Sequence, residues 1–377
     1  MKTPQGSAMT TSWDMLKAKG GSLAGLIFRS CGMQLNAFAQ TAPARLPVTV
    51  RGKRIKTVDV HAHCYFQEAL DIAGVKVEKV VPPVKGIPEH FIAGNAIEKR
   101  LADMDAMAID MEILSINPFW YRYERDKVEA ICKTNNEKLA ELCAQNPDRF
   151  GAFASLPMQF PDLAVTMLES AIKKQGLKGA AIGGSVAGDD FARAKYHPVL
   201  QKAEELGAVL FIHPQSTPEL AERFKGNGWL ANTIGNPLDT TIALQHLIFE
   251  GTLDKFPGLK VLAAHGGGYL PSYAMRGDHA CFVSPHNCDP GIQLKKKPSE
   301  YLNQLYYDAM VFSGEGLRHL VAQVGASQLM LGTDHPIPWE QHPVDHVMGA
   351  PLFDEDKMAI LGLNAAKLFG VKTNGAD

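Results

Sequence analysis

The sequence lacks the features that mark several large classes of protein. Its 377 residues contain no apolar run long enough to cross a membrane as a helix. It also lacks an excess of charge of one sign, since 38 basic and 40 acidic residues give a net charge of −2. The basic run at 295–297 fits a solvated loop. We therefore expect neither nucleic acid nor a membrane as a partner.

Recognisable cysteine motifs are missing as well. The six cysteines form neither a CxxC motif nor a dense framework, which favours free thiols in a reducing compartment and a cytoplasmic location. Cys64 directly follows a His-Ala-His motif, but strand alternation turns it to the opposite face from both histidines, so we interpret it as structural.

The N-terminal segment 1–46 has two interpretations. Lys17 and Lys19 precede an apolar stretch at 21–28, and Ala-Phe-Ala at 37–39 resembles a signal-peptidase site. The segment is then a degenerate export signal, and the mature protein is periplasmic. Alternatively, it is an arm that packs on the domain or on a partner subunit.

Residues 47–377 alternate short β-rich runs with longer amphipathic stretches. The eight predicted strands span residues 57–61, 111–116, 150–156, 179–182, 209–213, 260–265, 305–310 and 328–333. The predicted helices span residues 96–107, 127–146, 161–174, 197–206, 239–255 and 316–324. Helical crossovers imply parallel pairing, so an α/β fold of the (β/α)8 TIM-barrel type is the economical architecture. An open doubly wound sheet is the alternative, although no GxGxxG follows the first strand.

Polar residues gather where the predicted strands end. His61 and His63 stand two residues apart on the first strand, and alternation places Asp59 on the same face. Later strands end at His213, His265 and Asp334. Imidazoles and carboxylates at the C-terminal mouth of a barrel are costly to bury unless they are paired or bound to metal. The pattern predicts a metal centre.

The insertion at 67–94 follows the first strand on the same side of the barrel. It either covers the pocket or is a plain surface loop.

Four stretches resemble the amidohydrolase superfamily, in particular its branch of aromatic-acid and carboxymuconate-semialdehyde decarboxylases. They are VDVHAH, the His-Pro after the fifth strand, LIFEGTLDKFPGLKVLAAHGGGYLPSYAMR and LGTDHP. The resemblance runs from about residue 55 to about residue 370 and leaves the N-terminal segment unexplained.

The resemblance implies one divalent metal held by His61, His63, His213 and Asp334. Zinc is the expected ion and manganese the alternative, because histidine and carboxylate ligands suit both. Asp334 is also a catalytic candidate, and His265 acts on the metal-bound water or protonates the substrate. The fourth strand, Gly-Ala-Ala-Ile-Gly-Gly, lacks the lysine or carboxylate that bridges two metals, which implies a mononuclear site.

The substrate-binding candidates are fewer. Arg276 matches an arginine that holds a substrate carboxylate, in some family members across a dimer interface; the alternative is a surface ion pair with Asp278. Arg100 matches a second arginine more loosely, and we expect a solvated helix position. Trp120 and Trp229 are candidates for the walls of a pocket for a planar substrate, with the core as their alternative.

Asp59 is expected to orient a ligand histidine or to be a buried structural carboxylate.

The predicted function is metal-dependent, non-oxidative decarboxylation of an aromatic or muconate-semialdehyde-type acid by a homodimeric carboxy-lyase. The alternative chemistry at the same site is hydrolysis of a C–C, amide or lactone bond, or hydration. A non-catalytic sensor or scaffold is the third hypothesis, and it would require a lost ligand or a blocked pocket.

Overall fold

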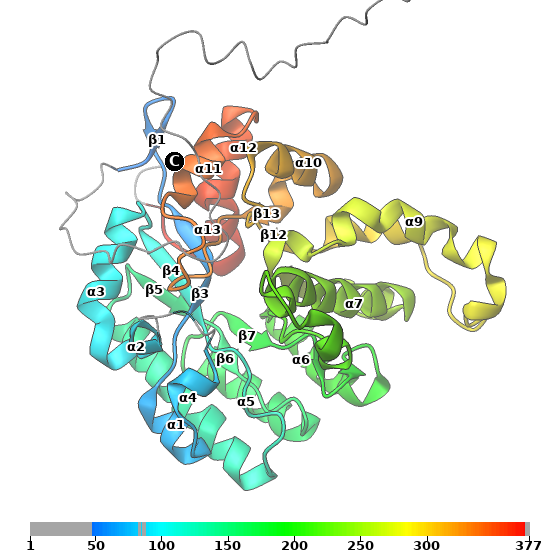
Figure 1. Cartoon of the computed structure of the whole chain (residues 1–377), viewed down its shortest axis with the longest axis horizontal. Coiled ribbons are helices and arrows are strands. Elements are labelled where there is room, and N and C mark those ends of the chain that lie inside the picture. Colours follow the sequence, from blue (N-terminus) through cyan, green and yellow to red (C-terminus); the bar gives the residue numbers. More distant parts are fainter. Residues whose placement is uncertain (1–46, 82–83, 85–87, 374–377) are drawn as a thin grey trace, which may run out of the picture. The chain divides into compact units, whose positions relative to one another are not determined.

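Eight parallel strands form a closed barrel. The computed structural model describes residues 47–81, 84 and 88–373, so the predicted N-terminal leader or arm lies outside the described residues. The barrel strands, in chain order, are β3 (Val58–His63), β4 (Met111–Ser115), β5 (Phe150–Ala152) continued by β6 (Ala154–Ser155), β7 (Gly179–Ile182), β10 (Val209–Ile212), β11 (Lys260–Ala263), β12 (Tyr306–Asp308) and β13 (Leu329–Met330). The TIM-barrel prediction is confirmed, and each expected strand is present within a few residues of its predicted bounds (Figure 1).

Closure of the barrel comes from hydrogen bonds between its first and last strands. The Val60 N–H donates to the Leu331 carbonyl at 2.9 Å, and the Asp334 N–H donates to the His61 carbonyl at 2.7 Å. The His63 N–H donates to the His335 carbonyl at 2.7 Å. The segment that carries Asp334 is therefore attached directly to the strand that carries the two histidines.

Helices and hairpins surround the barrel. The helices are α1 (Gln67–Ala73), α2 (Pro88–Phe91), α3 (Ala93–Ala106), α4 (Arg125–Gln145), α5 (Pro161–Lys173), α6 (His197–Leu206), α7 (Asn236–Phe249), α8 (Thr252–Lys255), α9 (Leu270–Val283), α10 (Gly314–Val324), α11 (Pro343–Gly349), α12 (Asp354–Met358) and α13 (Asn364–Phe369). Two short hairpins pair β1 (Thr49–Val50) with β2 (Lys53–Arg54) and β8 (Ser185–Val186) with β9 (Asp189–Asp190). No helix within the described ranges has the length and apolarity needed to span a membrane.

Two helical segments differ from the expectation. The helix predicted over 239–255 is divided into α7 and α8, because Gly251 adopts φ = 68° between them. The sequence pattern did not predict α9, which begins after the turn at 265–268 and extends away from the barrel (Figure 1).

The barrel interior is apolar below the site. Val58, Val60, Phe211 and Phe369 belong to one buried cluster to which the barrel strands and α13 contribute. Phe153 stacks on Phe211 with ring centroids 5.3 Å apart and meets Phe369 edge-on at 5.7 Å. The polar groups at the strand ends therefore stand on a packed apolar floor.

Candidate metal centre

A bulge in β3 directs the two histidines into the barrel. The pairing of β3 with β4 shifts by one residue between Asp59 and Ala62. Val58 and Val60 pack in the interior cluster, whereas Ala62 belongs to the cluster between barrel and helices. A bulge inserts one unpaired residue and changes which face later side chains occupy. His61 and His63 consequently point inward, and the expectation that Asp59 shares their face is wrong.

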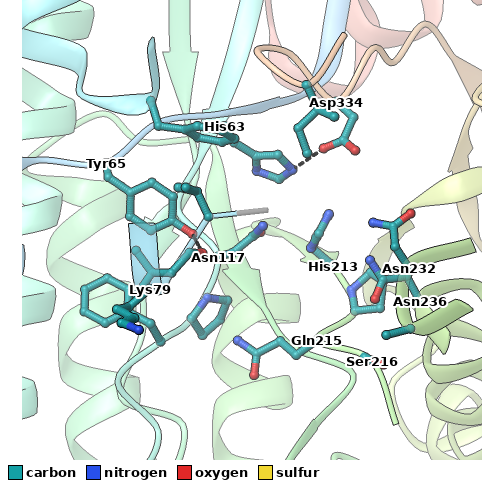
Figure 2. Close-up of a pocket in the computed structure, with 18 of the residues that line it drawn as sticks. His63, Tyr65, Lys79, Asn117, His213, Gln215, Ser216, Asn232, Asn236 and Asp334 are labelled. Atoms are coloured by element: carbon teal, nitrogen blue, oxygen red, sulfur yellow. Dashed lines mark hydrogen bonds and ion pairs between the residues drawn. The ribbon is translucent and has the colours of Figure 1, made fainter. Parts of the chain in front are cut away.

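Four side chains of the metal-binding type converge at the mouth. One nitrogen or oxygen atom from each of His61, His63, His213 and Asp334 lies within 4.8 Å of all the others, and all four residues are buried. The Nε2 atoms of His61 and His63 are 3.1 Å apart. The Asp334 Oδ1 atom lies 2.9 Å from His63 Nε2 and 3.5 Å from His61 Nε2. Figure 2 shows His63 and Asp334 facing each other, with His213 beside them.

The donor set fits a divalent transition metal. Neither ring nitrogen of His213 has a hydrogen-bond partner among the described residues, although both are buried. A buried imidazole without a partner is costly unless an ion or a water completes it. Three imidazole nitrogens and one carboxylate oxygen match the ligand preferences of zinc and are compatible with manganese.

Three further side chains fix the orientation of these groups. The buried Asp308 carboxylate accepts a hydrogen bond from His61 Nδ1 at 2.7 Å, which leaves Nε2 free to face the other donors. The Ser115 hydroxyl lies 2.8 Å from His63 Nδ1, and Trp339 Nε1 donates to Asp334 Oδ2 at 2.8 Å. Such partners set the tautomer and basicity of metal ligands.

Sequence reasoning missed these three residues. Asp308 ends the seventh strand just as the recognised candidates end theirs, so the same signal could have found it. Ser115 and Trp339 have no comparable signal, because neither residue type is a usual metal ligand.

Asp59 instead secures the segment before Asp334. Its carboxylate accepts hydrogen bonds from the Thr333 N–H at 3.1 Å, the Thr333 hydroxyl and the His61 N–H at 2.9 Å. Burial and the nearby Glu112 raise the pKa of Asp59 to about 7. Within the described part of the chain it bonds to backbone and hydroxyl groups, which matches the structural alternative and not the orientation of an imidazole.

His265 lies beside the ligand set. Its ring centroid is 5.2 Å from that of His61 and 5.4 Å from that of His213. Burial and the nearby His61 lower the pKa of His265 to about 4. The ring is therefore neutral at pH 7, and its protonated form would be a strong acid.

A glycine turn brings His265 into place. His265 itself has φ = 56°, and its N–H donates to Asp308 Oδ2 at 2.8 Å. A Cβ at Gly268 would lie 2.1 Å from the Pro237 carbonyl oxygen, and one at Gly267 would lie 2.6 Å from the Tyr307 ring. Only glycine fits these positions.

The ionisation of the ligands is strongly coupled. Although burial alone would lower it, hydrogen bonds to Asp308 and Asp334 raise the pKa of His61 to about 10. Burial lowers the pKa of His63 and holds that of His213 well below the usual value. Burial opposes ionisation of Asp334, yet His61 and His63 keep the pKa of Asp334 well below its usual range. Without a metal, the site holds a proton on His61.

Arg100 is buried, contrary to the expectation of a solvated position. Its guanidinium pairs with Glu112 at 2.7 Å and donates to the His63 carbonyl. Glu112 also lies 2.6 Å from His335 Nδ1. Arg100 therefore links the ends of β3 and β4 through His63 and Glu112, and it does not line the ligand pocket described next. A helical pattern could not reveal this partner on a neighbouring strand.

A pocket of about 570 Å³ opens above the candidate ligands, and we call it the ligand pocket. Its described lining consists of His63, Tyr65, Lys79, Val80, Val81, Phe91, Asn117, Pro118, Phe119, Tyr121, Arg122, His213, Pro214, Gln215, Ser216, Trp229, Ala231, Asn232, Asn236, Asp334 and Ile337. Several come from the insertion at 67–94, which therefore borders the pocket. The aromatic walls suit a planar ligand, and amide side chains face it from two sides (Figure 2).

The two tryptophan candidates differ in position: Trp229 lines the pocket, and Trp120 does not. Trp229 lines the ligand pocket and stacks on Trp339 with centroids 5.6 Å apart and an interplanar angle of 13°. Trp120 is fully buried in the core and donates from Nε1 to the Leu156 carbonyl at 2.9 Å. The prediction of Trp120 as a pocket wall is wrong, because its neighbours Phe119 and Tyr121 take the two positions that face the cavity.

Arg276 lies outside the ligand pocket of its own chain. It is exposed on α9 and borders a separate cavity of about 820 Å³, which we call the α9 cavity, together with Phe249, Glu250, His279 and the segment 280–294. The alternative ion pair with Asp278 is not formed either, since Asp278 accepts hydrogen bonds from the Ser299 N–H and hydroxyl.

The expectation of free thiols is wrong for two cysteines. Cys281 and Cys288 form a disulfide with a sequence separation of seven residues. Their spacing is not a recognised motif, and they meet only because the chain turns back after α9. Cys64 and Cys132 are free and buried, in agreement with a structural role for Cys64.

Comparisons with known proteins agree with this geometry. The model of the amidohydrolase family (Amidohydro_2) matches residues 58–371. The chain is similar to 2-amino-3-carboxymuconate-6-semialdehyde decarboxylase of Dictyostelium discoideum, with 31% identity over 73% of this chain and 77% of that protein. It is also similar to γ-resorcylate decarboxylase of a Rhizobium species, with 30% identity over 74% of this chain and 88% of that protein.

A solved structure adds a metal to the comparison. Dihydroxybenzoic acid decarboxylase from a Polaromonas species, with bound manganese and the inhibitor 2-nitroresorcinol, superimposes with a TM-score of 0.72 and 26% identity. The match covers 84% of this chain and 97% of that one. Together with the converging donor set, this neighbour supports a divalent metal in the present site.

Proposed function

This chain belongs to the amidohydrolase family, and on that premise we propose that it is a metal-dependent decarboxylase of an aromatic or muconate-semialdehyde-type acid. The observation that carries the proposal is the convergence of His61, His63, His213 and Asp334, of which the last three line an aromatic-walled pocket. The relatives named above are decarboxylases, which supports loss of CO2 over hydrolysis at the same ligand set.

We assign the metal to these four residues, with zinc as the expected ion and manganese as the alternative. When bound, a divalent ion orients the substrate and stabilises the negative charge that develops as CO2 leaves. Asp308, Ser115 and Trp339 hold the ligands in place. The aromatic walls exclude water from the planar ring of the substrate.

We assign proton transfer to His265, which lies next to the ligand set. The low pKa makes the neutral ring a weak base and its protonated form a strong acid. A proton passed to His265 from an acidic group of the bound substrate is therefore given up readily to the carbon that has lost CO2. Asp334 would contribute the one negative charge among the four metal ligands. Trp229 lines the ring-binding wall.

The test is CO2 release by metal-quantified protein from a panel of hydroxybenzoates and carboxymuconate semialdehydes. We expect CO2 from wild type and a loss of at least about 100-fold in kcat for His265→Ala, in the range of general acid–base contributions. His342→Ala, at an exposed histidine outside the described pocket lining, is the matched control and should retain full activity. Products that gain oxygen from labelled water, with no CO2, would contradict the proposal.

We also propose a homodimer in which Arg276 reaches the ligand pocket of the other subunit. The support is the exposed apolar surface beside it, since Tyr273, Met275, Phe282 and Val283 are 62–87% exposed. Patches of this kind mark interaction surfaces.

Complementation tests the shared site. A hybrid of one Arg276→Ala subunit and one His265→Ala subunit should recover about half of the wild-type activity, because one of its two sites is complete. Hybrids that stay inactive, or an active monomer, would contradict a shared site. Sedimentation of the wild type measures the subunit number.

We infer from the Cys281–Cys288 bond that the protein works in an oxidising compartment, where disulfides persist. This favours the exported alternative over the cytoplasmic one. Fractionation of cells, with thiol counting of the isolated protein, tests the inference. A cytoplasmic protein with both thiols free would contradict it.

A further inference from the structure

Two basic side chains border the ligand pocket within a single chain. Lys79 ends the 3₁₀ turn Val77–Lys79 in the insertion after β3, and Arg122 follows β4 in the segment that leads to α4. Both are exposed, and both line the same cavity as His63, His213 and Asp334. Figure 2 draws Lys79 across the pocket from Asp334.

Neither charge is neutralised by a carboxylate. Within the described residues, Lys79 forms no ion pair, and Arg122 has only the ring of Tyr123, at 5.9 Å from its guanidinium carbon. The one acidic residue in the described lining is Asp334, which already faces His61 and His63. By contrast, two other basic side chains of the following helix do form ion pairs: Arg125 pairs with Asp162, and Lys138 pairs with Glu68.

We propose that Lys79 and Arg122 form a binding site for a second anionic group of the substrate, so that the preferred ligand is an aromatic diacid. The proposal rests on the proposed function, because the first carboxylate is the one placed at the metal ligands. The guanidinium of Arg122 can hold a carboxylate with two hydrogen bonds, and the ammonium of Lys79 adds a mobile point charge.

The pocket has the shape that such a ligand needs. A volume of about 570 Å³ is in the usual range for small-molecule sites and accommodates one substituted ring. Tyr65, Phe91, Phe119 and Tyr121 supply flat apolar walls for a ring. The charged side chains of the described lining are Asp334 with the metal ligands at one end and Lys79 and Arg122 elsewhere. His63, His213 and Asp334 line the pocket on the side of the metal ligands, whereas Lys79 and Arg122 are its exposed basic lining residues.

This site is distinct from Arg276. The α9 cavity and the ligand pocket share no lining residue in the described part of the chain. Recognition by Lys79 and Arg122 therefore occurs in cis and does not depend on a second subunit. An arginine on α9 and these two cations can act on different carboxylates of one ligand.

The test is calorimetric binding of benzene-1,3-dicarboxylate and of benzoate to the zinc-loaded protein. We expect the diacid to bind wild type at least about 10-fold more tightly than benzoate, which corresponds to one charge-assisted contact. The double variant Lys79→Gln/Arg122→Gln should weaken diacid binding by about 10- to 100-fold and leave benzoate within twofold. Arg122→Lys should keep part of the preference, and added salt should reduce it.

The double variant Lys76→Gln/Arg125→Gln is the matched control. It makes the same change in net charge on the same two segments, at exposed positions outside the described pocket lining. Unchanged unfolding midpoints show that each variant is folded. Equal binding of both ligands by wild type, equal weakening of both ligands in the test variant, or an equal effect in the control variant would overturn the proposal.

Binding does not require turnover, so the two hypotheses fail separately. A protein that prefers the diacid through Lys79 and Arg122 but releases no CO2 from any substrate would refute decarboxylation alone. A protein that releases CO2 equally well from monoacids and diacids, with no effect of the double variant, would refute the second anion site alone.

Discussion

Replacement of Asp308 by asparagine tests how far the metal site depends on a residue that holds no metal. The carboxylate receives four hydrogen bonds: Oδ2 accepts from His61 Nδ1 at 2.7 Å and from the His265 N–H at 2.8 Å, and Oδ1 accepts from two further backbone N–H groups. In Asp308→Asn, one of these two acceptor positions becomes an NH2 donor that faces other donors. Either the ring of His61 or the backbone at Gly266 and Met310 then loses its partner.

The magnitude follows from the role of such partners. Loss of the group that orients a ligand histidine costs about 10- to 100-fold in metal affinity, which is about 1.4–2.8 kcal/mol. The unpaired buried donor costs a further ~1–3 kcal/mol of folding stability. Asp308→Asn should therefore weaken metal binding and lower the unfolding midpoint of the metal-free protein.

Chelator competition measures the affinity, and thermal unfolding with and without metal measures the stability. Asp278→Asn is the matched control, since Asp278 also accepts hydrogen bonds from a backbone N–H and a hydroxyl, but on α9. A folded Asp308→Asn protein with wild-type metal affinity would refute the reasoning that His61 is held by this carboxylate.

Three more predictions concern the same barrel. Trp339→Phe keeps the stack on Trp229 but removes the hydrogen bond to Asp334, so chelator competition should show roughly tenfold weaker metal binding; unchanged affinity would contradict this. Because the pKa of His61 is raised to about 10, the metal-free site is protonated at pH 7, and metal uptake should release about one proton and weaken as the pH falls. Calorimetry in buffers of different ionisation enthalpy counts that proton, and uptake without proton release would contradict it. Phe369→Ala empties the floor beside Phe153, and denaturant unfolding should show a loss of about 3–5 kcal/mol, a loss below 1 kcal/mol being the contrary result.

Local patterns predicted the parts of the fold that depend on local physics. Buried parallel strands need continuous apolar runs, as in Val209–Ile212, and these runs located the strands and therefore the strand ends. The convergence of His61, His63, His213 and Asp334 follows once the barrel closes. For these four residues the sequence predicted the grouping, and the structure supplies the distances between their donor atoms.

The errors arose where a contact joins distant segments. The bulge in β3 depends on its pairing with β4, and it leaves the Asp59 side chain on the other face from the two histidine rings. Arg100 is buried because Glu112 lies on the adjacent strand, and Trp120 is buried because Leu156 offers a carbonyl to its indole N–H. None of these partners is visible in a window of neighbouring residues.

The helix α9 shows a second kind of limit. Four large apolar residues of α9 are exposed in the single chain: Tyr273, Met275, Phe282 and Val283. The apolar positions of this helix therefore do not form a face that packs on the barrel. An amphipathic pattern assumes that apolar residues face the core of the same chain. A helix whose large apolar residues are exposed in its own chain violates this assumption.

The central claim is that decarboxylation depends on one divalent ion held by the residues at the pocket floor. The most direct measurement records metal content and CO2 release on the same samples of wild type and His213→Ala, before chelation, after chelation and after metal is returned. We expect about one ion per chain in wild type, CO2 release that is lost and regained with that ion, and neither ion nor CO2 in His213→Ala. CO2 release that persists in metal-free protein, or a wild type that binds no metal, would contradict it.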